Sequence, residues 1–324
     1  MKAIQITKFG GPDVMQYLEL PDPTHVDNEV LLDVTSIGIN YADTHQTENS
    51  YLSAQTLPLI PGLEITGTYQ GKRYLAPVSG GGYAQKAVAN KYALIEIPDG
   101  VTNEEALCML VQGTTAWHIL KTVGHLKSGE SVVVHAAAGG VGTLSIQLAK
   151  LWGAKVIAVT SNDSKKKLAK DLGADEVIDS NTDNLKANIL AANGGKSVDL
   201  VLEMVGGKTT DISLDVLAPF GRMIVYGNAS RTPSQNLNPG SLMGGSKTIT
   251  GFWLAHCFGN KELLNELNSL PNRYNIDTKY GVFQNAKITL KLFVDTQAKF
   301  GHEVWVRELL KYLIENWKSF KIKK

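Results

Sequence analysis

The sequence has few cysteines, almost no net charge and no long apolar run. Its two cysteines, Cys108 and Cys257, are too few and too far apart to suggest a disulfide framework or a thiolate zinc site. The net charge is +1, so composition gives no hint of nucleic-acid binding or of an anionic membrane surface. No apolar run reaches spanning length, and residues 2–6 begin directly as a strand-like run without a signal peptide. We therefore expect a cytoplasmic protein that contacts neither nucleic acid nor membrane.

The remaining composition is that of a globular chain. Hydrophobic residues make up 43% and charged residues 19% of the 324 residues, a length that suggests two domains. Residues 1–98 contain short runs broken by Pro and Gly, which predict a mostly antiparallel β domain. A helix is expected over 103–123 with Asn103 as its cap. The expected strands of this part are 3–7, 29–37, 65–69, 73–77, 83–88 and 94–97.

From about residue 113 to 254, strand-like and helix-like segments alternate. This pattern predicts an α/β fold with a Rossmann doubly wound parallel sheet, beside the antiparallel β domain. Six strands are expected, which is the number in a complete dinucleotide-binding sheet. They are 132–135, 155–160, 176–178, 200–203, 222–226 and 248–253. Beyond residue 260 we expect the chain to return to the first domain.

The most informative stretch is 130–165, where a β-branched run leads through a glycine-rich turn into a helix. Ala137, Gly139 and Gly142 occupy the three positions of G-x-G-x-x-G, with alanine for the first glycine. Gly139 lets a pyrophosphate approach the backbone, and Gly142 lets the helix pack closely. Helix-start amides, including those of Gly140 and Val141, then hold the phosphates. The alternative is a glycine turn that binds no nucleotide.

The end of the second strand of this unit indicates which dinucleotide binds. NAD-binding proteins usually carry Asp or Glu there, about 20 residues past the first glycine. Here residues 159–162 read Val-Thr-Ser-Asn, without a carboxylate to repel a 2′-phosphate. Ser161 and Lys165 offer a hydroxyl and a positive charge, so we expect NADPH. Lys166 and Lys167 are expected on a solvated helix face, and Asp163 argues mildly for NADH unless it caps the helix.

Several motifs belong to one enzyme family, and they cover residues 1 to about 255. They are Asn40-Tyr41-Ala42-Asp43, the P-x-x-P-G-x-E-x-x-G run from Pro58 to Gly67, Gly82-Tyr83-Ala84-Gln85, Gln112-Gly113-Thr114-Thr115-Ala116, the Ala-Gly-Gly-Val-Gly turn and Val205-Gly206-Gly207. The chain resembles the zinc-free quinone oxidoreductase (zeta-crystallin-like) branch of the medium-chain dehydrogenase/reductase superfamily. The resemblance implies a GroES-like catalytic domain over 1–112 and 256–324, a Rossmann domain over 113–255, and a homodimer.

The resemblance also implies a reaction, namely metal-free hydride transfer from NADPH to a quinone or an activated alkene such as an enone. It places Asn40 and Asp43 near the nicotinamide and substrate, and Thr115 under the nicotinamide ring. Tyr51 stands where related enoyl reductases have a tyrosine that positions or protonates substrate. Asn40 and Asp43 could instead form a turn, and Tyr51 could be a half-exposed core aromatic.

The turns after the last two strands of the Rossmann sheet are further candidates. Gly227 follows the fifth strand, and Phe252 and Trp253 end the sixth. Ligands of such sheets lie beyond the carboxyl ends of the strands. We therefore expect backbone groups of these turns to hold the nicotinamide carboxamide and its ribose.

The chain departs from its relatives at three places. Leu63 stands where zinc enzymes of the superfamily have a ligand histidine, and too few N/S ligands remain for a catalytic zinc. Thr47 and Asn49 replace an Arg and a Gly of the substrate motif. Ser180 stands where many relatives have a tyrosine on the NADPH phosphate. Two other functions remain open: a non-catalytic NADPH-binding protein of structural or regulatory type, and an alcohol dehydrogenase-type oxidoreductase.

Overall fold

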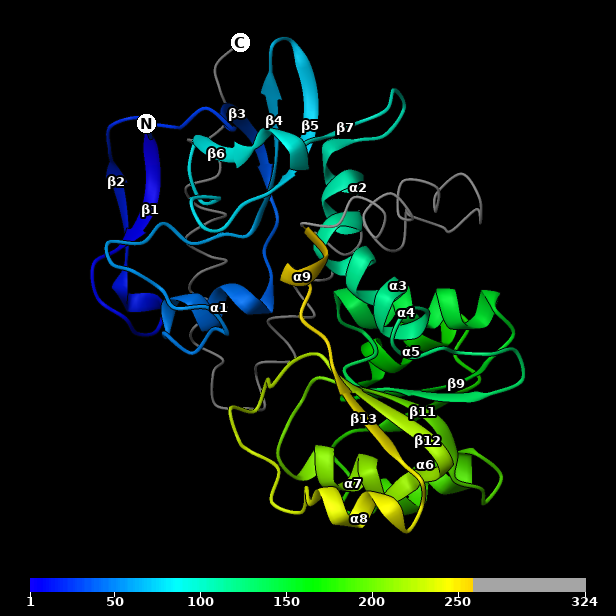
Figure 1. Ribbon diagram of the computed structural model, residues 1–324. Helices are drawn as coiled ribbons and strands as arrows, with labels where there is room; N and C mark the ends of the chain where they lie inside the picture. Colours follow the sequence, from blue (N-terminus) through cyan, green and yellow to red (C-terminus); the bar gives the residue numbers. More distant parts are fainter. Residues whose placement is uncertain (259–324) are drawn as a thin grey trace. The chain divides into compact units, whose positions relative to one another are not determined.

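The computed structural model of the chain describes residues 1–258 (Figure 1). It divides into two compact units, of which one contains residues 1–111 and the other begins at Gln112. This boundary adjoins the predicted one, but the predicted return of the chain over 256–324 falls almost wholly outside the described residues. The domain division therefore stays a prediction. The resemblance also predicts a closing strand at 301–306, followed by an added helix at 307–319, and both lie outside the described residues.

The first unit is built from antiparallel strands, as its sequence pattern predicts. A five-stranded sheet has the order β6-β3-β4-β5-β7, and β1 pairs with β2 in a separate two-stranded sheet. The strands are β1 (Lys2–Ile6), β2 (Met15–Glu19), β3 (Glu29–Ile37), β4 (Glu64–Tyr69), β5 (Lys72–Pro77), β6 (Lys86–Asn90) and β7 (Ile95–Glu96). Between β3 and β4 lies the helix α1 (Tyr41–Thr47), and two 3₁₀ turns span Pro12–Val14 and Lys91–Ala93.

Alternation along β3 explains the core of the first unit. Val30 and Leu32 are buried on one face of the strand and lie opposite Ala89 and Ala87 of β6. This period of two is the one that a half-buried strand requires. Strand β2 has no fully buried residue, which explains why its sequence gave no such signal.

The predicted helix over 103–123 is interrupted. Helix α2 (Asn103–Cys108) passes through a π-helical turn (Met109–Gly113) into α3 (Thr114–Leu120). The predicted cap Asn103 is wrong, because Thr102 is the N-cap. Thr102 Oγ1 accepts from the Glu105 amide at 3.1 Å, and the Glu105 carboxylate accepts from the Thr102 amide at 2.8 Å. This reciprocal pair is a capping box, in which the N-cap is the Ser or Thr that lies three positions before a glutamate.

The second unit contains a six-stranded, wholly parallel sheet with the order β10-β9-β8-β11-β12-β13 (Figure 1). The strands are β8 (Ser131–Val134), β9 (Lys155–Thr160), β10 (Glu176–Asp179), β11 (Val198–Glu203), β12 (Leu217–Val225) and β13 (Thr248–Gly251). In chain order this is 3-2-1-4-5-6, the order of a dinucleotide-binding sheet. The predicted α/β fold class is confirmed.

Helices connect these strands: α4 (Gly140–Leu151), α5 (Asp163–Asp171), α6 (Leu185–Ala192), α7 (Lys208–Val216) and α8 (Pro239–Met243). A further helix, α9 (Ala255–Phe258), follows β13. Leu144 and Leu148 of α4 are buried, whereas Leu151, which follows them at helical spacing, is 46% exposed at the end of the helix. Among the helices of residues 1–258, none combines the length and apolar character that a bilayer crossing requires.

Candidate active site

The glycine-rich turn between β8 and α4 has the close packing that its motif predicts. A Cβ on Gly142 would lie 2.6 Å from the Ala136 carbonyl oxygen and 2.7 Å from Ala137 Cα. These neighbours are backbone atoms, which cannot rotate away, so only glycine lets α4 approach the turn this closely.

The start of α4 presents backbone amides at the carboxyl end of β8. Gly139 is the N-cap residue in an extended conformation, and its carbonyl accepts the first helical hydrogen bond from Thr143 at 2.9 Å. The amides of Gly140 and Val141 precede that bond, in the part of a helix where N–H groups have no intrahelical acceptor. A Cβ on Gly140 would overlap the Gln112 side chain. Phosphate binding by Gly139, Gly140 and Val141 stays a prediction that this geometry fits.

At the carboxyl end of β9, the two residues predicted to bind a 2′-phosphate lie together. Lys165 Nζ donates to Ser161 Oγ at 3.4 Å, and the lysine is 1% exposed. Asn162, not Asp163, caps α5, because its Oδ1 accepts from the Lys165 amide at 3.0 Å. Asp163 instead begins the helix with an exposed side chain. Contact between Ser161 or Lys165 and a phosphate remains predicted.

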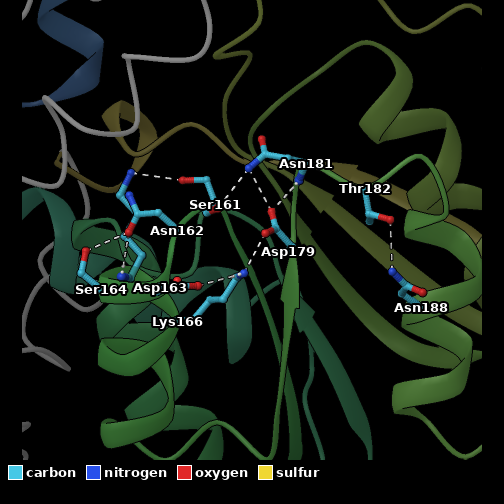
Figure 2. A network of polar contacts seen from close by, with 10 residues as sticks. Ser161, Asn162, Asp163, Ser164, Lys166, Asp179, Asn181, Thr182 and Asn188 are labelled. Atoms are coloured by element: carbon cyan, nitrogen blue, oxygen red, sulfur yellow. Dashed lines mark hydrogen bonds and ion pairs between the residues drawn. The ribbon is translucent and has the colours of Figure 1, made fainter.

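The sequence reasoning missed a carboxylate beside this position. Asp179 ends β10 and pairs in register with Thr160, the last residue of β9. Its carboxylate forms a 2.7 Å ion pair with Lys166 (Figure 2). Lys166 is therefore less solvated than expected, because its side chain pairs with Asp179 and is 29% exposed. Lys167 is exposed as expected and pairs with Asp171. The order of the strands, which brings β10 beside β9, was the signal needed to find Asp179.

In the first unit, the motif residues Asn40 and Asp43 belong to a buried group that we call the acid network (Asn40, Asp43, Glu64 and Tyr83). Asn40 lies directly before α1, and its Nδ2 donates to Glu64 Oε1 at 2.7 Å. Asp43 Oδ2 accepts from the Asn40 amide at 2.8 Å and from the Tyr83 hydroxyl at 2.7 Å. The amide of Val111 donates to Glu64 Oε2 at 3.0 Å. Asn40 and Asp43 thus begin α1 and also join a polar cluster.

Burial changes the acidity of both carboxyl groups of the acid network. It raises the pKa of Asp43 to about 7 and the pKa of Glu64 to about 8. Hydrogen bonds oppose both shifts: Asn40 and Tyr83 donate to Asp43, and Asn40 and Val111 donate to Glu64. Within residues 1–258 neither group forms an ion pair, and Asp43 Oδ1 is buried without a hydrogen-bond partner. Groups of this kind can take up and release a proton near neutral pH.

The remaining predicted site residues lie at three places. Tyr51 follows α1 and is half-buried. Thr115 is the second residue of α3 and is buried. Gly227 follows β12, and Phe252 and Trp253 follow β13, at the carboxyl edge of the sheet. The Phe252 amide donates to the Val225 carbonyl at 2.9 Å, which fixes the turn after β13 to the end of β12. Their contacts with a cofactor or substrate stay predicted.

No metal-binding group can be assembled from the described residues. Between Met1 and Phe258, no cluster of three or more His, Cys, Asp or Glu side chains could hold a metal ion. A catalytic zinc needs about three protein ligands. The donor set of this part of the chain therefore does not fit such a site, and no chemical step is assigned to a metal.

Comparison with known proteins identifies the family. A family described as zinc-binding dehydrogenase matches residues 140–269. A quinone oxidoreductase of Pseudomonas aeruginosa is 34% identical over 254 residues, which is 74% of this chain and 77% of the relative. One of Salmonella typhimurium is 32% identical over 320 residues, covering 93% and 94%. The solved structure of an Escherichia coli quinone oxidoreductase complexed with NADPH matches with a TM-score of 0.79 and 28% identity, covering 87% of this chain and 89% of that one. This chain belongs to the quinone oxidoreductase branch of the medium-chain dehydrogenase/reductase family.

Proposed function

We propose that this protein is an NADPH-dependent oxidoreductase that transfers hydride to a quinone or an activated alkene. The observation that carries the proposal is the carboxyl edge of the parallel sheet. There a glycine turn admits only glycine at Gly142, and Ser161 and Lys165 lie together where NAD-binding proteins place a carboxylate. The complex of the E. coli relative with NADPH supports the same cofactor for this chain.

Different residues of the second unit bind different parts of NADPH in this proposal. The amides of Gly139, Gly140 and Val141 hold the pyrophosphate, and Ser161 and Lys165 hold the 2′-phosphate. Backbone groups of Gly227, Phe252 and Trp253 hold the carboxamide and ribose at the nicotinamide end, while Thr115 supports the ring. When bound, the cofactor supplies a hydride from C4 of the nicotinamide.

The acid network handles the charge that hydride transfer creates on the substrate oxygen. One Nδ2 hydrogen of Asn40 is held by Glu64, and the amide carries a second one that can donate to that oxygen. Asp43 has a pKa raised to about 7, so its carboxyl group can hold a proton next to Asn40. Tyr51 is proposed to position or protonate the substrate. Although the matching family is described as zinc-binding, the described residues offer no zinc ligand set.

We also propose a cytoplasmic homodimer. Strand β13 (Thr248–Gly251) lies at one edge of the six-stranded sheet. An edge strand carries unpaired N–H and C=O groups that can pair with a second copy of the same strand. Sedimentation of the full chain tests this proposal, because a monomer at micromolar concentration would contradict it.

Turnover tests the proposed activity. NADPH oxidation is followed by absorbance with a panel of quinones and enones, with and without a metal chelator. We expect substrate-dependent oxidation that the chelator does not change. If no substrate is turned over while NADPH still raises the melting temperature of the protein, the hypothesis of a non-catalytic NADPH-binding protein is correct. If the chelator abolishes activity and alcohols are oxidised, the alcohol dehydrogenase alternative is correct.

A further inference from the structure

Asp179 lies one strand away from the end of β9, where a nucleotide-binding sheet recognises the adenosine ribose. It ends β10, and its register partner Thr160 directly precedes Ser161. The Ser180 amide donates to the Thr160 carbonyl at 2.8 Å, and Asn181 Nδ2 donates to the Ser161 carbonyl at 3.0 Å (Figure 2). In NAD-binding proteins the carboxylate that holds the ribose 2′-hydroxyl ends the second strand, which is β9 here. Asp179 ends the neighbouring strand β10, and a negative charge there would repel a 2′-phosphate bound at Ser161.

Both oxygens of Asp179 already have partners. Oδ2 accepts from Lys166 Nζ at 2.7 Å, and Oδ1 accepts from the Asn181 amide and from Asn181 Nδ2, both at 2.9 Å. The hydrogen bond from Lys166 is the main reason that the pKa of Asp179 is lowered, so the carboxylate is charged. Its charge faces an ammonium group, and its lone pairs are directed to Lys166 and Asn181.

Asp179 is the main partner of Lys166. The second contact of Lys166 is with Asp163 at 3.4 Å, and the Asp163 side chain is fully exposed. Exposed pairs of this kind contribute little. Lys167, the next residue, instead pairs with Asp171 farther along α5.

We infer that Lys166 determines coenzyme specificity by neutralising Asp179, so that the edge formed by β9 and β10 accepts a 2′-phosphorylated ribose. The inference rests on the proposed NADPH function and deepens it. Ser161 and Lys165 are proposed to touch the phosphate, whereas Lys166 acts through Asp179. A negative charge that would disfavour a 2′-phosphate is present at the end of the neighbouring strand β10, and Lys166 cancels it.

Two nucleotide probes that differ only in the 2′-phosphate isolate this effect. Calorimetric titration of the full chain with adenosine 2′,5′-bisphosphate and adenosine 5′-monophosphate gives an affinity ratio for each variant. Lys166→Gln should lower the affinity for the bisphosphate by about fivefold to tenfold, because an uncancelled carboxylate then faces the phosphate across a partly exposed edge. The monophosphate should bind as before. The loss should shrink at high salt.

Three further variants separate this effect from a structural one. Lys166→Arg should keep the wild-type ratio, and Lys167→Gln, which removes an equal charge one residue away, should keep it too. In the double variant Lys166→Gln/Asp179→Asn the bisphosphate affinity should return to within about twofold of wild type, since no charge is left to cancel.

The outcomes that would overturn the inference are distinct. An unchanged ratio in Lys166→Gln means that Asp179 does not face the phosphate. A loss that persists in the double variant means that Lys166 itself binds the phosphate, and the role of Asp179 is then wrong. If the wild-type chain binds both probes equally, the NADPH proposal fails, whatever the variants do.

A fourth variant is Asp179→Asn alone, which retains Lys166. It should bind the bisphosphate at least as tightly as wild type.

Discussion

Two carboxyl sites of this chain, the acid network of the first unit and Asp179 of the second, have opposite pKa shifts. In the first unit, Asp43 and Glu64 are buried, and the donors that contact them within residues 1–258 are uncharged, so their pKa values rise to about 7 and 8. In the second unit, Asp179 lies at a partly exposed sheet edge beside Lys166, and its pKa is lowered. The chemical groups are alike, and their surroundings decide whether each one stores a proton or carries a fixed charge.

This difference matches the two tasks of a hydride-transferring enzyme. A reduced substrate oxygen needs hydrogen-bond donors and a proton source whose pKa lies near the working pH. A cofactor site needs charges that do not change with pH. The acid network fits the first task and the Lys166–Asp179 pair fits the second.

The largest expected effect comes from removing Glu64. Glu64→Ala would leave Asn40 Nδ2 and the Val111 amide without their buried acceptor and open a cavity, and we expect it to lower the free energy of unfolding by about 2–4 kcal/mol. Glu96→Ala is the matched control, because Glu96 lies in the same unit but in an exposed ion pair with Lys72. Urea unfolding of both variants tests this prediction. Equal stability of the two would contradict a structural role for the acid network.

The second prediction concerns pH. A carboxyl group whose pKa is raised by folding binds more protons in the folded state, so its contribution to stability falls as pH rises from the unfolded value towards the folded one. For Glu64 that window runs from 4.5 to about 8. We expect the free energy of unfolding to fall by about 1–3 kcal/mol between pH 5 and 8, and Glu64→Gln to flatten the slope. Asp179 acts with the opposite sign and in a different window. Because folding lowers its pKa below 3.8, its contribution to the free energy of unfolding is present above that pH and is lost as the pH falls below it. A wild-type stability that rises over this range would contradict the assignment.

A smaller effect is expected from Tyr83→Phe. The Tyr83 hydroxyl donates to Asp43 Oδ2 at 2.7 Å in a fully buried position. Its loss should lower the free energy of unfolding by about 1–2 kcal/mol and raise the pKa of Asp43 further, because that hydrogen bond favours the charged form. Tyr92→Phe, at an exposed position, serves as the control and should leave the free energy of unfolding almost unchanged. An Asp43 titration by NMR that is unmoved in Tyr83→Phe would rule out this coupling.

The smallest effect is expected at a half-exposed pair in the second unit. Lys150 contacts both oxygens of Asp175 at 2.8 Å, and both side chains are about one-third exposed. Lys150→Gln should lower the free energy of unfolding by less than about 1 kcal/mol, with a smaller loss at high salt. A loss greater than that of Tyr83→Phe would mean that the paired carboxylates, not the buried ones, dominate stability.

Local patterns were sufficient to predict most of the fold. Short runs bounded by Pro and Gly predicted β3 (Glu29–Ile37), and an apolar run after the glycine turn and helix predicted β9 (Lys155–Thr160), each to the residue. The requirement for Gly142 also followed from a local motif. Strand β2 escaped prediction because it has no buried face, and the cap at Thr102 was missed because two neighbouring residues can both cap and only Glu105 selects between them.

The site was less predictable because its contacts join distant parts of the chain. Asn40 and Glu64 were both in motifs, but their hydrogen bond spans 24 residues and needs the pairing of β3 with β4. The raised pKa values depend on burial, which no motif states. The Lys166–Asp179 pair needs β10 beside β9, so sequence reasoning placed Lys166 in solvent and considered only the residue after Asp179.

Direct transfer of hydride is the central claim, and an isotope label tests it most directly. The enzyme is supplied with NADPH carrying deuterium at both C4 positions and with an enone that it reduces. We predict one deuterium bound to carbon in the reduced product, together with slower turnover than with unlabelled NADPH. A reduced product without deuterium would contradict the account.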